Sequence, residues 1–181
     1  LGFSEDRCVY GSPFEYRGGV STLKLGIEYA DYVNTVSEQY AIEISTSPDY
    51  GLGLEGVLAE RRKDGRLVGI LNGVDYRVWD PRVDELIPSS YSVEDLSGKA
   101  ECKRALLERS ELGADPAPPL IGMVSRLADQ KGFDLLKEVG DRIVSLGARL
   151  VVLGTGQQEY HEFLRKLADR HPEEVAAFLT F

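Results

Sequence analysis

The carboxyl-terminal part of the sequence alternates short apolar runs with amphipathic stretches, and this alternation limits the fold more than any other feature. Three runs predict strands: residues 120 to 125, 149 to 153 and 175 to 181. Two stretches between them predict helices: residues 132 to 146 and 157 to 170. Strands that alternate with helices form parallel sheets with right-handed crossovers. The pattern therefore predicts a βαβαβ unit, the first half of a nucleotide-binding α/β sheet.

Each of the two predicted helices has one apolar face. The apolar positions of the first helix are Leu136, Val139, Ile143 and Leu146. Those of the second helix are Tyr160, Leu164, Leu167 and Ala168. Because these residues recur every three or four positions, we expect them to pack against the sheet.

The amino-terminal part predicts a second, less regular α/β region. Residues 20 to 31 predict a helix and residues 32 to 36 a strand. Ser37 is expected to cap a short helix that ends near Ile44. Residues 67 to 71 form a compact apolar run, which predicts a buried strand.

An irregular crossing separates these two regions. Asn72 and Gly73 interrupt the last apolar run, and two X-Pro pairs follow, at Pro81 and Pro88. Beyond them, the segment from Ser92 to Asp95 has capping-box spacing and predicts a helix through about Leu112. We therefore assign residues 1 to 71 to one domain, 72 to 91 to the crossing, and 92 to 181 to a second domain.

The composition excludes several classes of protein. Hydrophobic residues make up 43% of the 181-residue chain, which argues against intrinsic disorder. No apolar run reaches the length of about 18 residues that a membrane span needs. A net charge of -9 argues against a nucleic-acid or anionic-membrane partner. Cys8 and Cys102 give neither a disulfide framework nor metal-ligand spacing, as expected for reduced thiols in a cytosolic protein.

Two cations follow the first strand of the βαβαβ unit. Arg126 comes directly after this strand, and Lys131 precedes the next helix. A cation near a helix amino terminus opposes the helix dipole unless an anion binds there, and Arg and Lys both bind phosphate. The alternative is that these cations pair with Asp129 and Asp134 at the surface. Position alone leaves both interpretations open.

A glycine-rich turn follows the second strand of the unit. Gly154 and Gly156 flank Thr155, and backbone can approach a ligand closely where side chains are small. Two-glycine turns are also common at strand-to-helix junctions with no ligand. The sequence lacks the GxGxxG pattern and the ribose-binding acid of dinucleotide sites, which argues against such a cofactor.

Three other residue positions suggest structure rather than chemistry. His161 and His171 have no partners that would form a catalytic triad or a metal site, so we expect both to face solvent. Trp79 is expected to pack at the crossing between the domains.

Six sequence blocks carry a more specific signal. They are residues 24 to 31 (KLGIEYAD), 35 to 37 (TVS), 40 to 44 (YAIEI), 51 to 57 (GLGLEGV), 69 to 75 (GILNGVD) and 124 to 132, in which VSRL is followed by QKG. In sequence, order and spacing these blocks closely resemble bacterial glycogen synthases and plastid starch synthases. The resemblance covers nearly the whole chain.

The resemblance implies a GT-B glycosyltransferase, in which two Rossmann-like domains face each other across a cleft. The implied reaction transfers glucose from ADP-glucose, less often UDP-glucose, to the non-reducing end of an α-1,4-glucan with retention of configuration. In this family the residues matching Arg126 and Lys131 hold the diphosphate and offset charge on the departing ADP. No metal or further cofactor is implied.

The resemblance also implies binding roles for residues on both sides of the crossing. Gly154, Thr155 and Gly156 match a turn that lies against the nucleotide, with Ser125 next to the diphosphate-binding arginine. Asn72 matches an asparagine near the sugar.

The family's amino-terminal Lys-x-Gly-Gly loop and its later glutamate segment are not found in this sequence. We therefore expect the chain to hold the end of the first GT-B domain and the first half of the second, and to be inactive by itself. A cytoplasmic protein is expected, or a stromal one if the source is a plant. Two alternatives remain: another nucleotide-sugar transferase resembling sucrose synthase, and a noncatalytic nucleotide- or glucan-binding module. The oligomeric state is not predicted.

Overall fold

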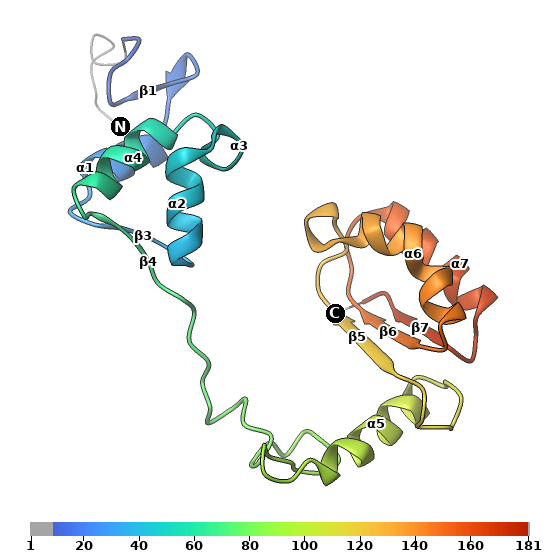
Figure 1. Ribbon diagram of the computed structural model, residues 1–181. Coiled ribbons are helices and arrows are strands. Elements are labelled where there is room, and N and C mark those ends of the chain that lie inside the picture. Colours follow the sequence, from blue (N-terminus) through green and yellow to red (C-terminus); the bar gives the residue numbers. More distant parts are fainter. Residues whose placement is uncertain (1–8, 181) are drawn as a thin grey trace. The chain divides into compact units, whose positions relative to one another are not determined.

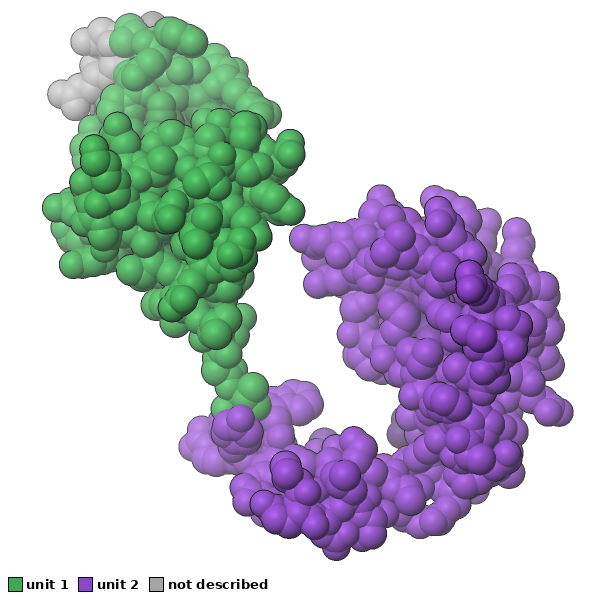
Figure 2. Space-filling model, in the orientation of Figure 1, with its two compact units in different colours: residues 1–74 green, residues 75–181 purple. Residues whose placement is uncertain are grey.

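The computed structural model describes residues 9 to 180, and the chain divides into two compact units (Figure 2). The first unit is Leu1–Val74 and the second is Asp75–Phe181. The boundary falls inside residues 72 to 91, where the sequence predicts a crossing. The assignment of the two units to parts of two Rossmann-like domains stays a prediction.

The first unit combines short strands with four helices among the described residues. In chain order its elements are β1 (Glu15–Tyr16), β2 (Gly19–Val20), α1 (Thr22–Tyr29), β3 (Val33–Thr35), α2 (Glu38–Thr46), α3 (Pro48–Gly51), α4 (Glu55–Lys63) and β4 (Leu67–Gly69). The strands β1 and β2 pair antiparallel, whereas β3 and β4 pair parallel, with Val33 opposite Leu67. Ile27, Ala41 and Leu58 belong to the buried cluster that joins the helices to β4.

Serine side chains start three helices of this unit. Ser21 accepts a hydrogen bond from the Lys24 N–H at 3.1 Å, and Ser37 accepts one from the Tyr40 N–H at 2.9 Å. Ser47 caps α3 in the same way through the Asp49 N–H. The predicted cap at Ser37 is confirmed. The helices α3 and α4 were not predicted, because they fall in turn-rich and charged sequence.

The second unit contains the predicted βαβαβ fold (Figure 1). After α5 (Ser97–Arg109) come β5 (Leu120–Val124), α6 (Phe133–Ser145), β6 (Arg149–Leu153), α7 (Gln158–Arg170) and β7 (Val175–Phe178). The sheet order is β5-β6-β7, and both pairings are parallel. The alternation of strands and helices therefore predicted this part of the fold correctly, with β7 ending earlier than expected.

The central strand β6 separates two layers of apolar contacts. Leu150 and Val152 are fully buried and pack with Leu164 and Leu167 of α7. Val151 points to the opposite face and packs with Leu107 from α5. Because side chains alternate across a strand, β6 is covered on both faces, as is typical of parallel sheets.

The buried face of α6 agrees with the predicted one in part: Leu136 is buried and Ile143 packs against the core. Val139 is 41% exposed and Leu146 is 76% exposed, so both predictions were wrong. Phe133, Leu136 and Gly140 are the buried residues of this helix. A Cβ on Gly140 would lie 3.0 Å from a methyl carbon of Leu167, which shows how closely α6 approaches α7. This close helix contact rotates Val139 toward solvent.

The helix α5 starts later and ends earlier than the sequence predicted. The Ser92 hydroxyl accepts hydrogen bonds from the Glu94 and Asp95 N–H groups, which forms a turn ahead of the helix. The helix itself begins at Ser97 without a side-chain cap and ends at Arg109. The capping-box prediction at Ser92 was therefore wrong.

Other expectations concern isolated side chains and membrane association. Trp79 is 71% exposed, and its expected packing at the crossing between the domains stays a prediction. Cys102 is a free thiol whose Sγ donates to the Ser89 carbonyl oxygen, and Cys8 lies outside the described residues. Within residues 9 to 180, no helix is long and apolar enough to cross a membrane.

The core of the second unit yields a stability prediction. Leu164 is fully buried, so Leu164→Ala should leave a cavity and lower the free energy of unfolding by about 2 to 5 kcal/mol. Leu135→Ala on α6 is the matched control, because Leu135 is 63% exposed. This substitution should change the free energy of unfolding by no more than about 0.5 kcal/mol. Urea denaturation followed by circular dichroism measures both. Equal effects of the two substitutions would contradict the assigned core.

Candidate functional site

The loops that follow β5 and β6 are joined through their backbones. The Leu127 N–H donates to the Thr155 carbonyl oxygen at 3.0 Å, and the Gln157 N–H donates to the Leu127 carbonyl oxygen at 2.9 Å. Leu127 and Gly156 form a parallel β-bridge beyond the ends of the strands. The Leu127 side chain is fully buried beneath this bridge. The two loops therefore form one structural element at the carboxyl edge of the sheet.

Both glycines of the second loop are needed for this contact. A Cβ on Gly154 would lie 1.9 Å from the Ser125 carbonyl oxygen, and a Cβ on Gly156 would lie 2.2 Å from the Leu127 carbonyl oxygen. No side chain fits at such distances. The sequence left two explanations for these glycines: close approach of a ligand, or a turn that binds no ligand. The backbone contact between the loops is sufficient to explain both glycines.

Arg126 and Lys131 both lie exposed at this edge of the sheet. Within residues 9 to 180, neither cation forms an ion pair with a carboxylate. Pairing with Asp129 and Asp134, the surface alternative, is therefore not observed. The two positive charges are available to an anion.

The helices that start at this edge have no side-chain caps. The 3₁₀ turn η2 (Asp129–Lys131) leads through Gly132, with φ of +76°, into α6. Gln157 precedes α7 and does not cap it with its side chain. Uncapped helix starts leave N–H groups without partners, and the helix dipole makes these ends favourable for anions. The helix starts and both cations thus favour a negatively charged ligand.

Two side chains in the first turn of α7 hold the two loops. The Gly156 N–H donates to His161 Nε2 at 3.1 Å, and the Thr155 hydroxyl lies 3.2 Å from the same nitrogen. The Tyr160 hydroxyl donates to an oxygen of the Asp129 carboxylate. Hydrogen bonding to Asp129 and burial raise the pKa of Tyr160 to about 12. Each loop therefore has its own anchor on α7.

The sequence missed these anchors. His161 was expected to face solvent, but it is half-buried against the glycine loop, so that expectation was wrong. His171 was also expected to face solvent, and it instead binds an Asp141 oxygen at 2.7 Å. The pKa of Asp141 is lowered by its hydrogen bonds with His171 and Arg170. Tyr160 was predicted as a core residue only, because its periodicity says nothing about its hydroxyl group.

The other predicted site residues have different surroundings. Ser125 is half-buried, and its hydroxyl donates to the Arg126 carbonyl oxygen at 3.2 Å. Asn72 is exposed and belongs to the first unit, whereas the remaining predicted site residues belong to the second. The structure thus brings together Ser125, Thr155 and their neighbours in the two loops, and leaves Asn72 as a separate prediction.

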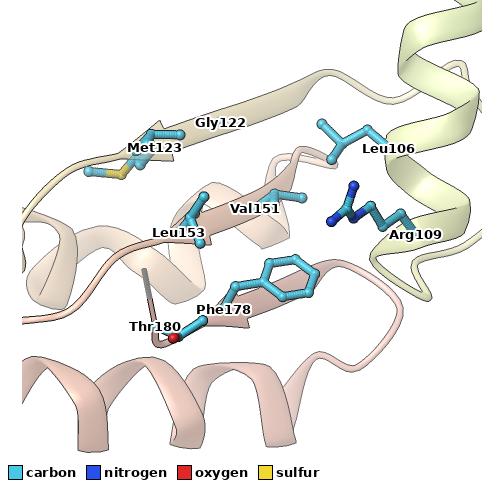
Figure 3. Close-up of a pocket in the computed structure, with 9 residues that line it drawn as sticks. Leu106, Arg109, Gly122, Met123, Val151, Leu153, Phe178 and Thr180 are labelled. Carbon is cyan, nitrogen blue, oxygen red and sulfur yellow. The ribbon is translucent and has the colours of Figure 1, made fainter. Parts of the chain in front are cut away.

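A second feature of the sheet is a cavity of about 440 Å³ beside α5 (Figure 3). Apolar side chains such as Leu153 and Phe178 line it, and Arg109 of α5 also lies on its wall. An apolar lining does not suit a charged ligand, so the cation-bearing loops are the better candidate site. No cluster of three or more His, Cys, Asp or Glu residues suited to a metal occurs in the part of the chain that is described.

The glycine contact yields a second prediction. Gly154→Ala should push Ser125 away and lower the free energy of unfolding of the second unit by about 1 to 3 kcal/mol or more. Gly122→Ala is the matched control, because a Cβ added at Gly122 would have no other atom within 4 Å. Denaturation curves measured by circular dichroism compare the two variants. A stable Gly154→Ala protein would show that the loops do not need this contact.

Comparison with known proteins gives one consistent result. Residues 1 to 60 match the family model described as the starch synthase catalytic domain. The glycogen synthase of Koribacter versatilis is 44% identical over 167 residues, which cover 92% of this chain and 34% of that protein. The glycogen synthase of Lactococcus lactis is 45% identical over 166 residues, with the same coverage.

A solved structure supports the relationship at the level of the fold. The catalytic domain of starch synthase IV from Arabidopsis thaliana, bound to ADP and acarbose, matches with a TM-score of 0.78 and 31% sequence identity. The match covers 90% of this chain and 33% of that one. The chain therefore spans about one third of the length of its relatives. Over that third, it belongs to the glycogen and starch synthase family.

Proposed function

We propose that the chain forms the nucleotide-sugar-binding part of a retaining glucosyltransferase that extends α-1,4-glucan from ADP-glucose. The observation that carries the proposal is the pair of unpaired cations, Arg126 and Lys131, beside two uncapped helix starts. In open parallel sheets, ligands bind at the carboxyl ends of the strands, where these residues lie. The resemblance to glycogen synthases and to a starch synthase domain that binds ADP supports the same assignment.

In this proposal the chain provides parts of two Rossmann-like domains of the GT-B type. Residues 1 to 71 supply the end of the acceptor-side domain, residues 72 to 91 the crossing, and residues 92 to 181 the first half of the donor domain. Asn72 contacts the sugar from the crossing. The acarbose in the related structure supports a glucan as the acceptor. The similarity to bacterial glycogen synthases supports a cytoplasmic location.

Electrostatics gives each cation a role in the proposed reaction. Glucosyl transfer leaves negative charge on the diphosphate of the departing ADP. Arg126 can donate two parallel hydrogen bonds to phosphate oxygens, and Lys131 adds a point charge. Fixed charges that face a developing anion are among the largest contributions to catalysis. The two cations would therefore stabilise the leaving group without a metal ion.

The loops around the cations support the proposed binding mode. Thr155 and Gly156 are held by His161, and Ser125 is held against the Gly154 backbone. A site fixed in this way needs little reorganisation when the anion arrives, which lowers the cost of binding. The Gly154 loop then lies beside the nucleotide, while its glycines serve the loop contact.

ADP affinity tests this assignment. Arg126→Ala and Lys131→Ala each remove a charge-assisted hydrogen bond of about 1.5 to 3 kcal/mol. The dissociation constant for ADP should therefore rise roughly 10- to 150-fold in isothermal titration calorimetry of the 181-residue chain. Lys166→Ala, which removes an exposed cation from α7, is the matched control and should leave the constant unchanged. Equal losses in all three variants would indicate an effect of net charge and refute the site.

Glucosyl transfer tests the catalytic part of the proposal. We expect no transfer from labelled ADP-glucose to glycogen by the chain alone, because proximity of donor and acceptor requires both walls of the cleft. A chimera in which this chain replaces the matching 166 residues of the Lactococcus lactis enzyme should be active. In that chimera, Arg126→Ala should lower kcat roughly 100- to 1,000-fold. A loss below about fivefold would exclude the proposed role in leaving-group stabilisation.

A further inference from the structure

The phenol of Tyr160 reaches from the first turn of α7 to the loop that carries both cations. Its side chain is only 3% exposed, and its ring lies 5.6 Å from the ring of Phe133 between centroids. The hydroxyl group donates to the Asp129 carboxylate, 31 positions away in the sequence. A buried hydroxyl is costly unless it is paired, so this contact fixes the position of Asp129 as well as that of Tyr160.

Asp129 has an unfavourable position for anion binding. It lies three residues after Arg126 and two residues before Lys131, so it places a negative charge among the two cations. A free carboxylate at this position has two cations within three positions along its own loop. An ion pair with either one would weaken binding of a diphosphate, because the cation would have to exchange one anion for another. In the structure Asp129 forms neither pair and is bound by Tyr160 instead.

The turn itself is built around the same residue. The Gly132 N–H donates to the Asp129 carbonyl oxygen at 2.8 Å, which closes η2 directly ahead of α6. The backbone of Asp129 thus shapes the turn, while its side chain is held by α7. His161, the next residue of α7, holds the other loop through Gly156. One helical turn therefore anchors both loops of the candidate site.

We propose that Tyr160 is a positioning residue of the diphosphate site: it binds the Asp129 carboxylate and thereby keeps it from pairing with Arg126 and Lys131. This inference rests on the proposed function, since it concerns the same site. A tyrosine hydroxyl is protonated at neutral pH even at its ordinary pKa of about 10, so it is available as a donor to Asp129. The hydrogen bond to Asp129 and burial raise the pKa of Tyr160 further, to about 12. Tyr160 itself does not touch the ligand.

Two substitutions separate this role from a structural one. Tyr160→Phe keeps the ring against Phe133 but frees the Asp129 carboxylate, so the dissociation constant for ADP should rise roughly 3- to 10-fold in calorimetry of the full chain. Adding Asp129→Asn to Tyr160→Phe removes the competing charge at equal size and should restore wild-type affinity. A purely structural role predicts no rescue, because the amide introduced at position 129 still lacks its tyrosine partner in the double variant.

The single variant Asp129→Asn gives an independent measurement that does not depend on Tyr160→Phe being folded. Asparagine retains an oxygen that accepts the tyrosine hydrogen bond and lacks the negative charge. The dissociation constant for ADP should therefore stay the same or fall. A rise would show that the charge at position 129 assists binding and would overturn the proposal.

The outcomes also separate this inference from the proposed function. If ADP binds, Arg126→Ala weakens it and Tyr160→Phe does not, only the role of Tyr160 is refuted. If the folded chain binds no ADP, or if Arg126→Ala has no effect, the proposed function fails and the role of Tyr160 fails with it. Circular dichroism establishes the folded state of each variant.

Discussion

The close backbone contact between the loops after β5 and β6 is the constraint on which the candidate site depends. Strand pairing alone aligns β5 with β6 only as far as Leu153. The bridge between Leu127 and Gly156 continues that alignment into the loops, and the absence of Cβ atoms at Gly154 and Gly156 makes the continuation sterically feasible. The position of Arg126 and the start of α7 follow from it. The site is therefore an extension of the sheet, which explains how exposed loops hold a fixed geometry.

The sequence predicted the second unit better than the first, for a physical reason. In the second unit the central strand β6 is buried along most of its length, and residues such as Leu150 and Leu164 produce clear apolar signals. The helix α4, which is described along its whole length, buries only Leu58 and ends in three basic residues, so its apolar signal is too weak to recognise. For α6, the periodicity placed Leu136 and Ile143 at the core correctly but misplaced Val139 and Leu146. The buried face depends on the contact between Gly140 and α7, which no local pattern encodes.

The candidate site was predicted in part. Residue type and position after a strand were enough to select Arg126 and Lys131, because both properties are local. The side chains that hold the loops come from α7, far along the chain from the first loop. Tyr160, for example, lies 31 positions after its partner Asp129. Periodicity placed Tyr160 in the core and His161 at the surface. Whether a polar atom at the end of such a side chain finds a partner is decided by tertiary structure, which a single sequence does not reveal.

The uncapped start of α7 would link the stability of the second unit to any anion that binds there. Gln157 has φ of -65° and ψ of 135°, the extended conformation in which a serine or aspartate side chain could cap the helix. Such a cap contributes about 1 kcal/mol, and the chain forgoes it here although three helices of the first unit have one. An anion at these N–H groups would supply the missing interaction only when bound. The occupied protein would then resist unfolding more than the empty one, so the concentration of that anion would influence the lifetime of the folded chain.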